Sequence, residues 1–301
     1  MPIAAALVVL LAGAANEPAP LAVDEVAPGV FVHAGRLVAL DAPGHDDIAN
    51  IGFVVGQRCV AVIDTGGSVR TGRALRAAVK ARTKLPVCYV IDTHVHVDHV
   101  LGNFAFADDK PSFVGHAALP AALARSRAFF VQTYPADFDG DARPEQVIAP
   151  DKTVADTLDL DLGKRTLHVK AWPKAHTDCD LTVRVDDDVL WTGDLLFRER
   201  VPALDGSVKG WLVAIDALSR TKVRVIVPGH GAVTRDVAAA FTPERRYLQV
   251  LSDGVRAELD ANRSIEHAID VVGAAEKPHW KLWDTAHPRN VSRVFQELEW
   301  N

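Results

Sequence analysis

The sequence has no run of basic residues, few cysteines and, after its first residues, no long apolar run. Its 39 acidic and 33 basic residues give a formal net charge of -6. We expect no nucleic-acid partner, because phosphate backbones are bound by clustered Lys and Arg. We also expect no membrane span in the mature chain, since the later apolar runs are shorter than the roughly 20 residues that a span needs. Apolar residues make up 49% of the 301 residues, enough for one large domain or two fused halves.

Cysteine occurs only at Cys59, Cys88 and Cys179, with no CxxC or other zinc-binding spacing. Cys59 opens the apolar run 59–63, and Cys88 lies near the start of the run 87–91. Adjacent parallel strands would therefore bring these two sulfurs side by side. A disulfide and a pair of buried thiols are both compatible with that arrangement.

The one long apolar stretch runs from Ile3 to Leu11 and is followed by small residues up to Ala15. This pattern is typical of a secretory signal peptide cleaved near Ala14 or Ala15. No Lys or Arg precedes it, which keeps an N-terminal anchor or a buried strand as alternatives. We expect residues 1–20 to be a signal peptide and linker, and the mature protein, from about residue 21, to be periplasmic or secreted.

The densest group of candidate metal ligands is His94, His96, Asp98 and His99, directly after the apolar run 87–91. Unprotonated imidazole nitrogens and carboxylate oxygens are the ligands that a borderline divalent ion such as zinc takes. His94 and His96 can point the same way, while Asp98 and His99 can turn toward a neighbouring position. The spacing predicts two metals rather than one. A solvated histidine-rich loop is the alternative, since a short motif alone carries a false-positive risk.

Apolar periodicity predicts the other elements. Residues 59–92 form a strand, helix and strand, a unit that favours a parallel sheet. The loop at 135–152 is the expected boundary between halves of about 21–150 and 151–301, and together with residues 41–50 it is expected to wall the site. Strands are predicted at 29–35, 36–40, 48–55, 59–63, 87–91, 112–114, 166–171, 181–185, 189–192 and 223–227, and helices near 69–81, 117–133, 208–218, 236–259 and 291–298.

Three further candidate ligands, His176, Asp194 and His230, each follow one of these later apolar runs. Each residue alone is well explained as part of a turn. Sites in open α/β sheets form beyond the carboxyl ends of strands, and all three residues fall at such ends, as does the cluster at 94–99. The four segments are therefore predicted to form one site.

Taken in order, HxHxDH, His176-Thr177, Gly193-Asp194 and Gly229-His230, with Asp64-Thr65-Gly66 upstream, resemble the metallo-β-lactamase fold superfamily of hydrolases over roughly residues 25–300. The resemblance implies an α/β fold, the four-layer αβ/βα sandwich, as a single domain over residues 21–301. It also implies that His94, His96 and His176 hold one zinc and that Asp98, His99 and His230 hold a second. Asp194 would bridge the two ions, Asp98 would also be catalytic, and a hydroxide shared by the ions would be the nucleophile.

The residue at position 194 and two sequence segments indicate which subfamilies of the superfamily the chain resembles. The commonest zinc β-lactamases carry Cys where Asp194 stands, whereas an Asp bridge resembles glyoxalase II, alkylsulfatases, lactonases and other dinuclear esterases. The segment from Asp46 to Phe53 and the ending from Pro288 to Trp300 resemble exported zinc metallohydrolases related to SoxH. Those proteins accompany quinoprotein (PQQ-dependent) oxidation systems, so a periplasmic quinoprotein system is an implied partner.

Supporting residues carry weaker signals. Asp64 is expected to orient the histidine cluster by hydrogen bonds, with a strand-end cap as the alternative; Asp92 and Asp178 are candidates of the same kind. His45 and Asn50 are candidates for substrate contact, with ordinary surface polarity as the alternative. The tryptophans Trp172, Trp191 and Trp211 are expected to pack in the core or at its rim.

The predicted function is an exported dinuclear zinc hydrolase acting on a small ester, thioester, lactone or amide. One alternative is a metal-binding accessory protein of a quinoprotein redox system that has no hydrolytic turnover, and a second is a β-lactamase. Iron is open as the metal, because the same ligands accept it. Oxygen or nitric oxide reduction at a di-iron site is a third alternative, although the chain has no room for the flavin domain that usually accompanies that chemistry.

Overall fold

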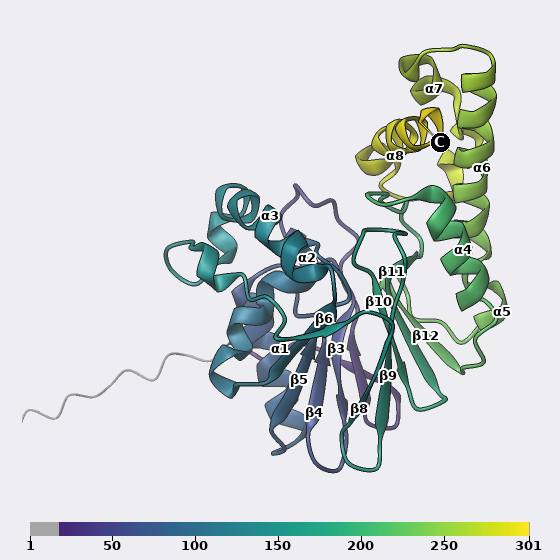
Figure 1. The fold of residues 1–301 in the computed structure, drawn as a ribbon. Coiled ribbons are helices and arrows are strands. Elements are labelled where there is room, and N and C mark those ends of the chain that lie inside the picture. Colours follow the sequence, from purple (N-terminus) through teal and green to yellow (C-terminus); the bar gives the residue numbers. More distant parts are fainter. Residues whose placement is uncertain (1–17, 301) are drawn as a thin grey trace, which may run out of the picture.

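The computed structural model describes residues 18–300 (Figure 1), so the predicted signal-peptide cleavage site lies outside the described residues. Two sheets and the helices flanking them make up this part of the chain. No helix in residues 18–300 is both long and apolar enough to traverse a bilayer.

The first sheet has seven strands in sequential order, β1 to β7. Pairing is antiparallel from β1 to β4 and parallel from β4 to β7. The strands are β1 (Asp24–Ala27), β2 (Val30–His33), β3 (Ile51–Val55), β4 (Val60–Ile63), β5 (Val87–Ile91), β6 (Ser112–His116) and β7 (Lys152–Val154).

The second sheet has five strands in the order β12-β11-β10-β9-β8. Its pairs are antiparallel except for β11 and β12, which are parallel. The strands are β8 (Thr157–Asp161), β9 (Thr166–Ala171), β10 (Leu181–Val185), β11 (Val189–Phe197) and β12 (Val225–His230).

Helices cover the outer face of each sheet, and the sheets pack on each other, which gives the predicted four-layer arrangement (Figure 1). Ile63 of the first sheet and Val183 of the second share the central core. The helices are α1 (Val69–Arg82), α2 (Val97–Val100) and α3 (Leu119–Thr133) beside the first sheet, and α4 (Val208–Leu218), α5 (Val237–Ala240), α6 (Thr242–Asp260), α7 (Ile265–Val271) and α8 (Trp283–Glu299) on the side of the second.

The unit β4-α1-β5 forms as predicted and sets the position of the site. Ser68 caps α1 by accepting a hydrogen bond from the Thr71 N–H. Leu75 and Val79 on the inner face of α1 pack on the first sheet. The crossover makes β4 and β5 parallel neighbours, so the residues that follow Ile63 and Ile91 emerge at the same edge.

Several element predictions were wrong. Residues 36–40 form no strand, because this segment bonds to a loop instead: the Gly35 N–H donates to Asn50 Oδ1, and the Arg36 N–H donates to the Asp47 carbonyl. Strands β1, β7 and β8 were not predicted. The helix expected at 236–259 is divided into α5 and α6, and the one expected at 291–298 begins earlier, at Trp283.

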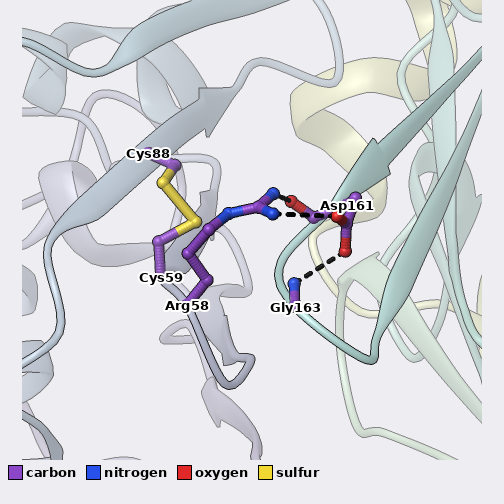
Figure 2. The surroundings of a disulfide bond; sticks show 5 residues. All are labelled: Arg58, Cys59, Cys88, Asp161 and Gly163. Carbon is purple, nitrogen blue, oxygen red and sulfur yellow. Dashed lines mark hydrogen bonds and ion pairs between the residues drawn. A yellow bond between two sulfur atoms is a disulfide. The ribbon is translucent and has the colours of Figure 1, made fainter.

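Cys59 and Cys88 form a disulfide between the beginnings of β4 and β5 (Figure 2). Beside it, the Arg58 guanidinium pairs with Asp161 at a distance of 2.9 Å, which ties the first sheet to the end of β8. The third cysteine, Cys179, is free and buried. The disulfide lies at the opposite ends of β4 and β5 from the predicted metal ligands, so it fixes the strands without entering the site.

Candidate metal centre

All the predicted ligands meet at the edge where the strands of both sheets end. The group at 94–99 follows β5, and His176 follows β9. Asp194 lies within β11 and His230 is the last residue of β12, whereas the sequence predicted both in loops. The ligand atoms form two neighbouring groups, His94, His96, His176 and Asp194 in one and Asp98, His99 and His230 in the other.

Two glycines of the predicted motifs allow this approach. Gly193 has a φ of 52°, and the register between β11 and β12 shifts beside it, so β11 bends where Asp194 must turn inward. A Cβ at position 229 would lie 1.9 Å from Asp194 Oδ1. Gly229 therefore leaves the space that the Asp194 carboxylate needs, whereas Gly193 supplies the bend in β11, and a Cβ there would lie 2.7 Å from Thr93 Cβ.

The first group has the spacing of a tetrahedral site. His96 Nδ1 lies 3.0 Å from His94 Nε2 and 3.0 Å from His176 Nε2. Asp194 Oδ2 lies 3.6 Å from His94 Nε2 and 3.4 Å from His176 Nε2. A tetrahedral ion with ligand bonds of about 2.0–2.1 Å places its ligand atoms about 3.3 Å apart. These four residues can therefore share one cation.

The second group has similar spacing and shares Asp194 with the first. Asp98 Oδ2 lies 3.6 Å from His99 Nε2 and 3.3 Å from His230 Nε2. Asp194 Oδ1 lies 3.2 Å from His99 Nε2, and its Oδ2 lies 3.4 Å from His230 Nε2. Because Asp194 contacts both groups, it stands where a bridging ligand would.

Each imidazole in the first group has its outward nitrogen directed at a hydrogen-bond acceptor. His96 Nε2 lies 2.8 Å from Asp205 Oδ2, and His176 Nδ1 lies 2.6 Å from the Ala203 carbonyl. His94 Nδ1 lies 3.1 Å from Thr93 Oγ1, whose own proton goes to a carboxylate of Asp64. An outward nitrogen that donates leaves the inward nitrogen of a neutral imidazole with a lone pair.

The same holds in the second group. His99 Nδ1 lies 2.8 Å from Asp64 Oδ2, and His230 Nδ1 lies 2.8 Å from the Ile48 carbonyl. Inward lone pairs from all five imidazoles therefore converge on the space that contains the Asp98 and Asp194 carboxylates. When the five imidazoles are neutral, this set contains acceptors only, and a divalent cation can satisfy it.

Buried atoms and pKa shifts support this fit. Within residues 18–300, His99 Nε2 and Asp194 Oδ1 are buried without a hydrogen-bond partner. Burial lowers the pKa of His94 well below its ordinary value and that of His176 to about 4, so both are neutral at pH 7. Burial also opposes the charged form of His99, but the Asp194 and Asp64 carboxylates outweigh it and raise the His99 pKa, so a proton competes with a cation there.

Asp64, for which the sequence predicted a supporting role, forms hydrogen bonds to Thr93 and His99. It is fully buried directly after β4. Its Oδ1 accepts from the Thr93 N–H at 2.8 Å, and its Oδ2 accepts from Thr93 Oγ1 and from His99 Nδ1, each at 2.8 Å. The Asp64 carboxylate therefore fixes both Thr93, where the histidine segment begins, and the ring of His99, the last residue of that segment.

The sequence did not identify Asp205, which supports His96 in the same way. Asp205 follows β11 and accepts hydrogen bonds from Arg289 and, through its backbone carbonyl, from Arg293 of α8. Asn290 of α8 donates to the Pro202 carbonyl and accepts from the Leu204 N–H. The C-terminal helix therefore holds the segment whose Ala203 and Asp205 orient two of the first-group imidazoles.

Other supporting predictions have mixed outcomes. Asp178 is exposed and pairs with Arg125, and Asp92 accepts from Asn103 rather than from a ligand. Asn50 is buried and donates to the Pro228 and Gly231 carbonyls, so it braces the His230 turn. His45 pairs with Asp137. The three tryptophans pack as predicted, all buried at Trp172, Trp191 and Trp211.

A pocket of about 260 Å³ opens onto both groups. The predicted loop at 41–50 contributes Ile48, but no residue of 135–152 lines the pocket, and Tyr134 stands there instead. Leu40 and Phe129, which are 38% and 55% exposed, form apolar parts of the lining. The remaining lining residues are His96, Val97, Asp98, Phe130, Asp194, Phe197, Arg200, Ala203, Asp205, His230 and Arg289.

We expect Asp205→Ala to weaken zinc binding at the first group about 10- to 100-fold, because His96 loses the carboxylate that fixes its ring and tautomer. Competition titration against a chromophoric chelator measures this. The matched control is Asp159→Ala, which removes an equivalent contact, 2.7 Å to His168, on an exposed surface of β8 and β9. Equal zinc affinities of the two variants would contradict the role of Asp205.

The comparisons with known proteins agree with this geometry. The sequence matches the metallo-beta-lactamase superfamily over residues 45–230. The comparison with curated proteins found no match. The fold is of the two-sheet α/β type with residues that could hold metal ions at the edge of both sheets. The chain belongs to the metallo-beta-lactamase superfamily, as the sequence predicted.

Solved structures share the fold at low identity. The stereoselective inverting sec-alkylsulfatase Pisa1 from Pseudomonas sp. is 18% identical with a TM-score of 0.67, and the match covers 91% of this chain and 50% of that one. A metallo-beta-lactamase from Pontibacter korlensis is 21% identical with a TM-score of 0.59, and the match covers 76% of this chain and 99% of that one. This chain therefore spans about half the length of the alkylsulfatase.

Proposed function

We propose that this protein is an exported dinuclear zinc-dependent hydrolase of small esters, thioesters, lactones or amides. The observation that carries the proposal is the convergence of five imidazole lone pairs and two carboxylates into two groups that share Asp194. The donor set of nitrogen and carboxylate oxygen suits zinc, and iron is the alternative metal.

Two divalent ions held there would lower the pKa of a shared water to about 7 and polarise the bond under attack. The chain's own residues hold and orient this centre. Burial opposes ionisation of Asp98, but His99 and His230 outweigh it and lower the Asp98 pKa, so its carboxylate can accept a hydrogen bond from the attacking water. Phe197 and Phe130 line the pocket and restrict bulk water around the reacting bond.

The pocket limits the substrate to a small molecule. Its volume of about 260 Å³ lies below the range of pockets for drug-sized ligands, about 300–1,000 Å³. β-Lactam hydrolysis is the alternative reaction, although Asp194 stands where the commonest zinc β-lactamases carry Cys. A metal-binding accessory role in a periplasmic quinoprotein system is the alternative without turnover, and its relation to SoxH-type proteins stays a prediction.

The test is metal analysis joined to a substrate panel. We expect about two zinc ions per chain, because the bridging Asp194 carboxylate would be shared between two ions. We also expect turnover to be lost after chelation and to recover when zinc is added. The panel contains chromogenic esters, thioesters, lactones, a β-lactam and a secondary alkyl sulfate. Two bound zinc ions without turnover on any member, together with saturable binding to a quinoprotein, would replace the hydrolase proposal with the accessory role. If protein expressed in unsupplemented medium contains iron instead of zinc, the metal would be assigned as iron.

We also propose that the protein works in the periplasm or outside the cell. The Cys59–Cys88 disulfide supports this, because disulfides persist in oxidising compartments. Protein recovered from a periplasmic fraction is expected to give one titratable thiol, Cys179, under denaturing, non-reducing conditions. Three thiols, or an intact N-terminus on the recovered chain, would contradict export.

A further inference from the structure

Glu244 is a fully buried carboxyl group that belongs to neither group of metal ligands. It stands in the first turn of α6 and is 0% exposed. Its Oε1 accepts a hydrogen bond from the Phe197 N–H at 2.9 Å, whereas its Oε2 is buried without a partner within residues 18–300. Burying a carboxyl group with so few hydrogen bonds costs stability. The bond to Phe197 is therefore the contact that explains why an acid stands there.

The Phe197 N–H lies where β11 departs from regular pairing. The register between β11 and β12 shifts between Gly193 and Phe197, the last residue of β11. Phe197 is paired with His230, and the next N–H, that of Arg198, donates to the His230 carbonyl at 3.0 Å. A register shift locally disrupts the hydrogen-bond ladder of a sheet. Glu244 supplies an acceptor from a neighbouring helix, and this acceptor fixes the end of β11 beside His230.

The Phe197 ring contacts one imidazole from each metal group. It stacks on His230 of the second group, with ring centroids 4.9 Å apart and an interplanar angle of 18°. It also lies against His176 of the first group, with centroids 5.5 Å apart. Trp211 contacts both Phe197 and His176, at centroid distances of 6.1 and 5.2 Å. Movement of Phe197 would therefore change the packing of a ligand in each group.

Resting on the proposed dinuclear centre, we propose that Glu244 is a positioning residue for both metal positions: its Oε1 fixes the Phe197 backbone, and the Phe197 ring fixes His176 and His230. This role needs an acceptor oxygen at Oε1 and does not need a charge. Burial raises the pKa of Glu244 well above its ordinary value, so this site disfavours the charged form and a neutral Gln suits it.

Two variants separate the acceptor oxygen from the rest of the side chain. Glu244→Leu removes the acceptor and is expected to weaken zinc binding at both positions about 10-fold, the lower end of the effect of groups that orient metal ligands. Glu244→Gln keeps an acceptor oxygen and is expected to bind zinc as the wild type does. Competition titration against a chromophoric chelator measures both affinities.

The matched control is Leu251→Ala. Leu251 is also fully buried and lies about two turns further along α6. Its truncation leaves a cavity and destabilises the same helix, but it removes no hydrogen bond to Phe197. This variant is expected to unfold at a lower denaturant concentration and to keep wild-type zinc affinity.

A second measurement depends on neither bound zinc nor turnover. An aromatic ring that stacks on another shields the protons of its neighbour, so the His230 ring protons of zinc-free, histidine-labelled protein are expected to resonate upfield in NMR spectra. Phe197→Leu removes the ring and thereby assigns this signal. Glu244→Leu is expected to move the signal toward its position in Phe197→Leu, whereas Glu244→Gln and Leu251→Ala are expected to leave it in place.

Several outcomes would overturn the proposal. One is wild-type zinc affinity together with an unmoved His230 signal in Glu244→Leu. Equal losses in the Leu and Gln variants would be another, since the carboxyl group itself would then be needed. Equal zinc loss in Leu251→Ala would assign the effect to general destabilisation.

Phe197→Leu decides the matter if Glu244→Leu does not fold. This variant keeps the backbone N–H that Glu244 accepts and removes only the ring. It is expected to weaken zinc binding at both positions, and unchanged zinc affinity would overturn the proposal. If zinc-loaded wild-type protein hydrolyses no substrate, the hydrolase function fails, while the zinc titration and the NMR spectra still test the role of Glu244.

Discussion

Asp194→Ala is expected to abolish turnover and to deplete both metal positions. Asp194 is the residue with short distances to both groups, 3.4 Å to His176 Nε2 and 3.2 Å to His99 Nε2. Its loss leaves Asp98 as the remaining carboxylate of the centre, so two dications would be held with half of the compensating charge. Since bound metals would supply most of the rate enhancement, we expect kcat/KM to fall on the order of 10³-fold or more.

Elemental analysis and steady-state kinetics on the same preparation measure this effect. Asp188→Ala is the matched control, because Asp188 lies near the start of the same strand and forms an exposed ion pair with Arg224. The control is expected to keep its zinc and its turnover. Full hydrolytic activity of Asp194→Ala in metal-depleted buffer would show that the centre is not where the chemistry takes place.

The parts of the site that the sequence predicted are those encoded by short, local signals. HxHxDH is contiguous, and Gly193-Asp194 and Gly229-His230 are pairs whose glycines have a steric reason. The strand that precedes each segment is apolar, so its carboxyl end could be located from the sequence. These signals predicted the fold and the convergence of the four segments.

The parts that the sequence missed depend on contacts between distant segments. Asp205 supports His96 across 109 residues, and Arg289 reaches Asp205 across 84. No sequence motif relates residues that lie so far apart. An Asp followed by Gly, as at Asp205-Gly206, predicts a turn rather than a residue that supports a metal ligand. Asp178, a candidate for the same supporting role, lies two residues after His176 in the sequence, but its side chain turns outward to Arg125.

The pocket lining was missed for a related reason. The loop at 135–152 is rich in Pro, Asp and Gly and was expected to wall the site. Instead, the loop is held together by internal hydrogen bonds, since the Gln146 amide donates to the Asp139 and Asp141 carbonyls. The lining comes instead from the end of α3, at Phe129 and Phe130, and from Tyr134 just beyond it. Which side of a helix end faces a site is decided by packing, which one sequence does not reveal.

Asp64→Asn is expected to weaken zinc binding at the second group about 10- to 100-fold and to destabilise the zinc-free protein. Asp64 has a φ of 52°, a left-handed conformation that Asn tolerates better than most residues, so this variant changes the hydrogen bonds with little backbone strain. The carboxylate accepts three bonds, two from Thr93 and one from His99. The asparagine amide group has one accepting oxygen, so at least one buried donor loses its partner, at a cost of about 1–3 kcal/mol.

Asp92→Asn is the matched control for Asp64→Asn. Asp92 is also fully buried and directly follows the neighbouring strand β5, but its bond is to Asn103. Burial, reinforced by the Asp64 charge, raises the Asp92 pKa well above its ordinary value, so this site disfavours the charged form and a neutral Asn suits it. We expect Asp92→Asn to keep wild-type zinc affinity and Asp64→Asn to lose it, measured by chelator competition and by denaturant midpoints of the zinc-free proteins. Equal zinc affinities would mean that the His99 ring is held by packing alone and that the Asp64 carboxylate is a strand-end cap.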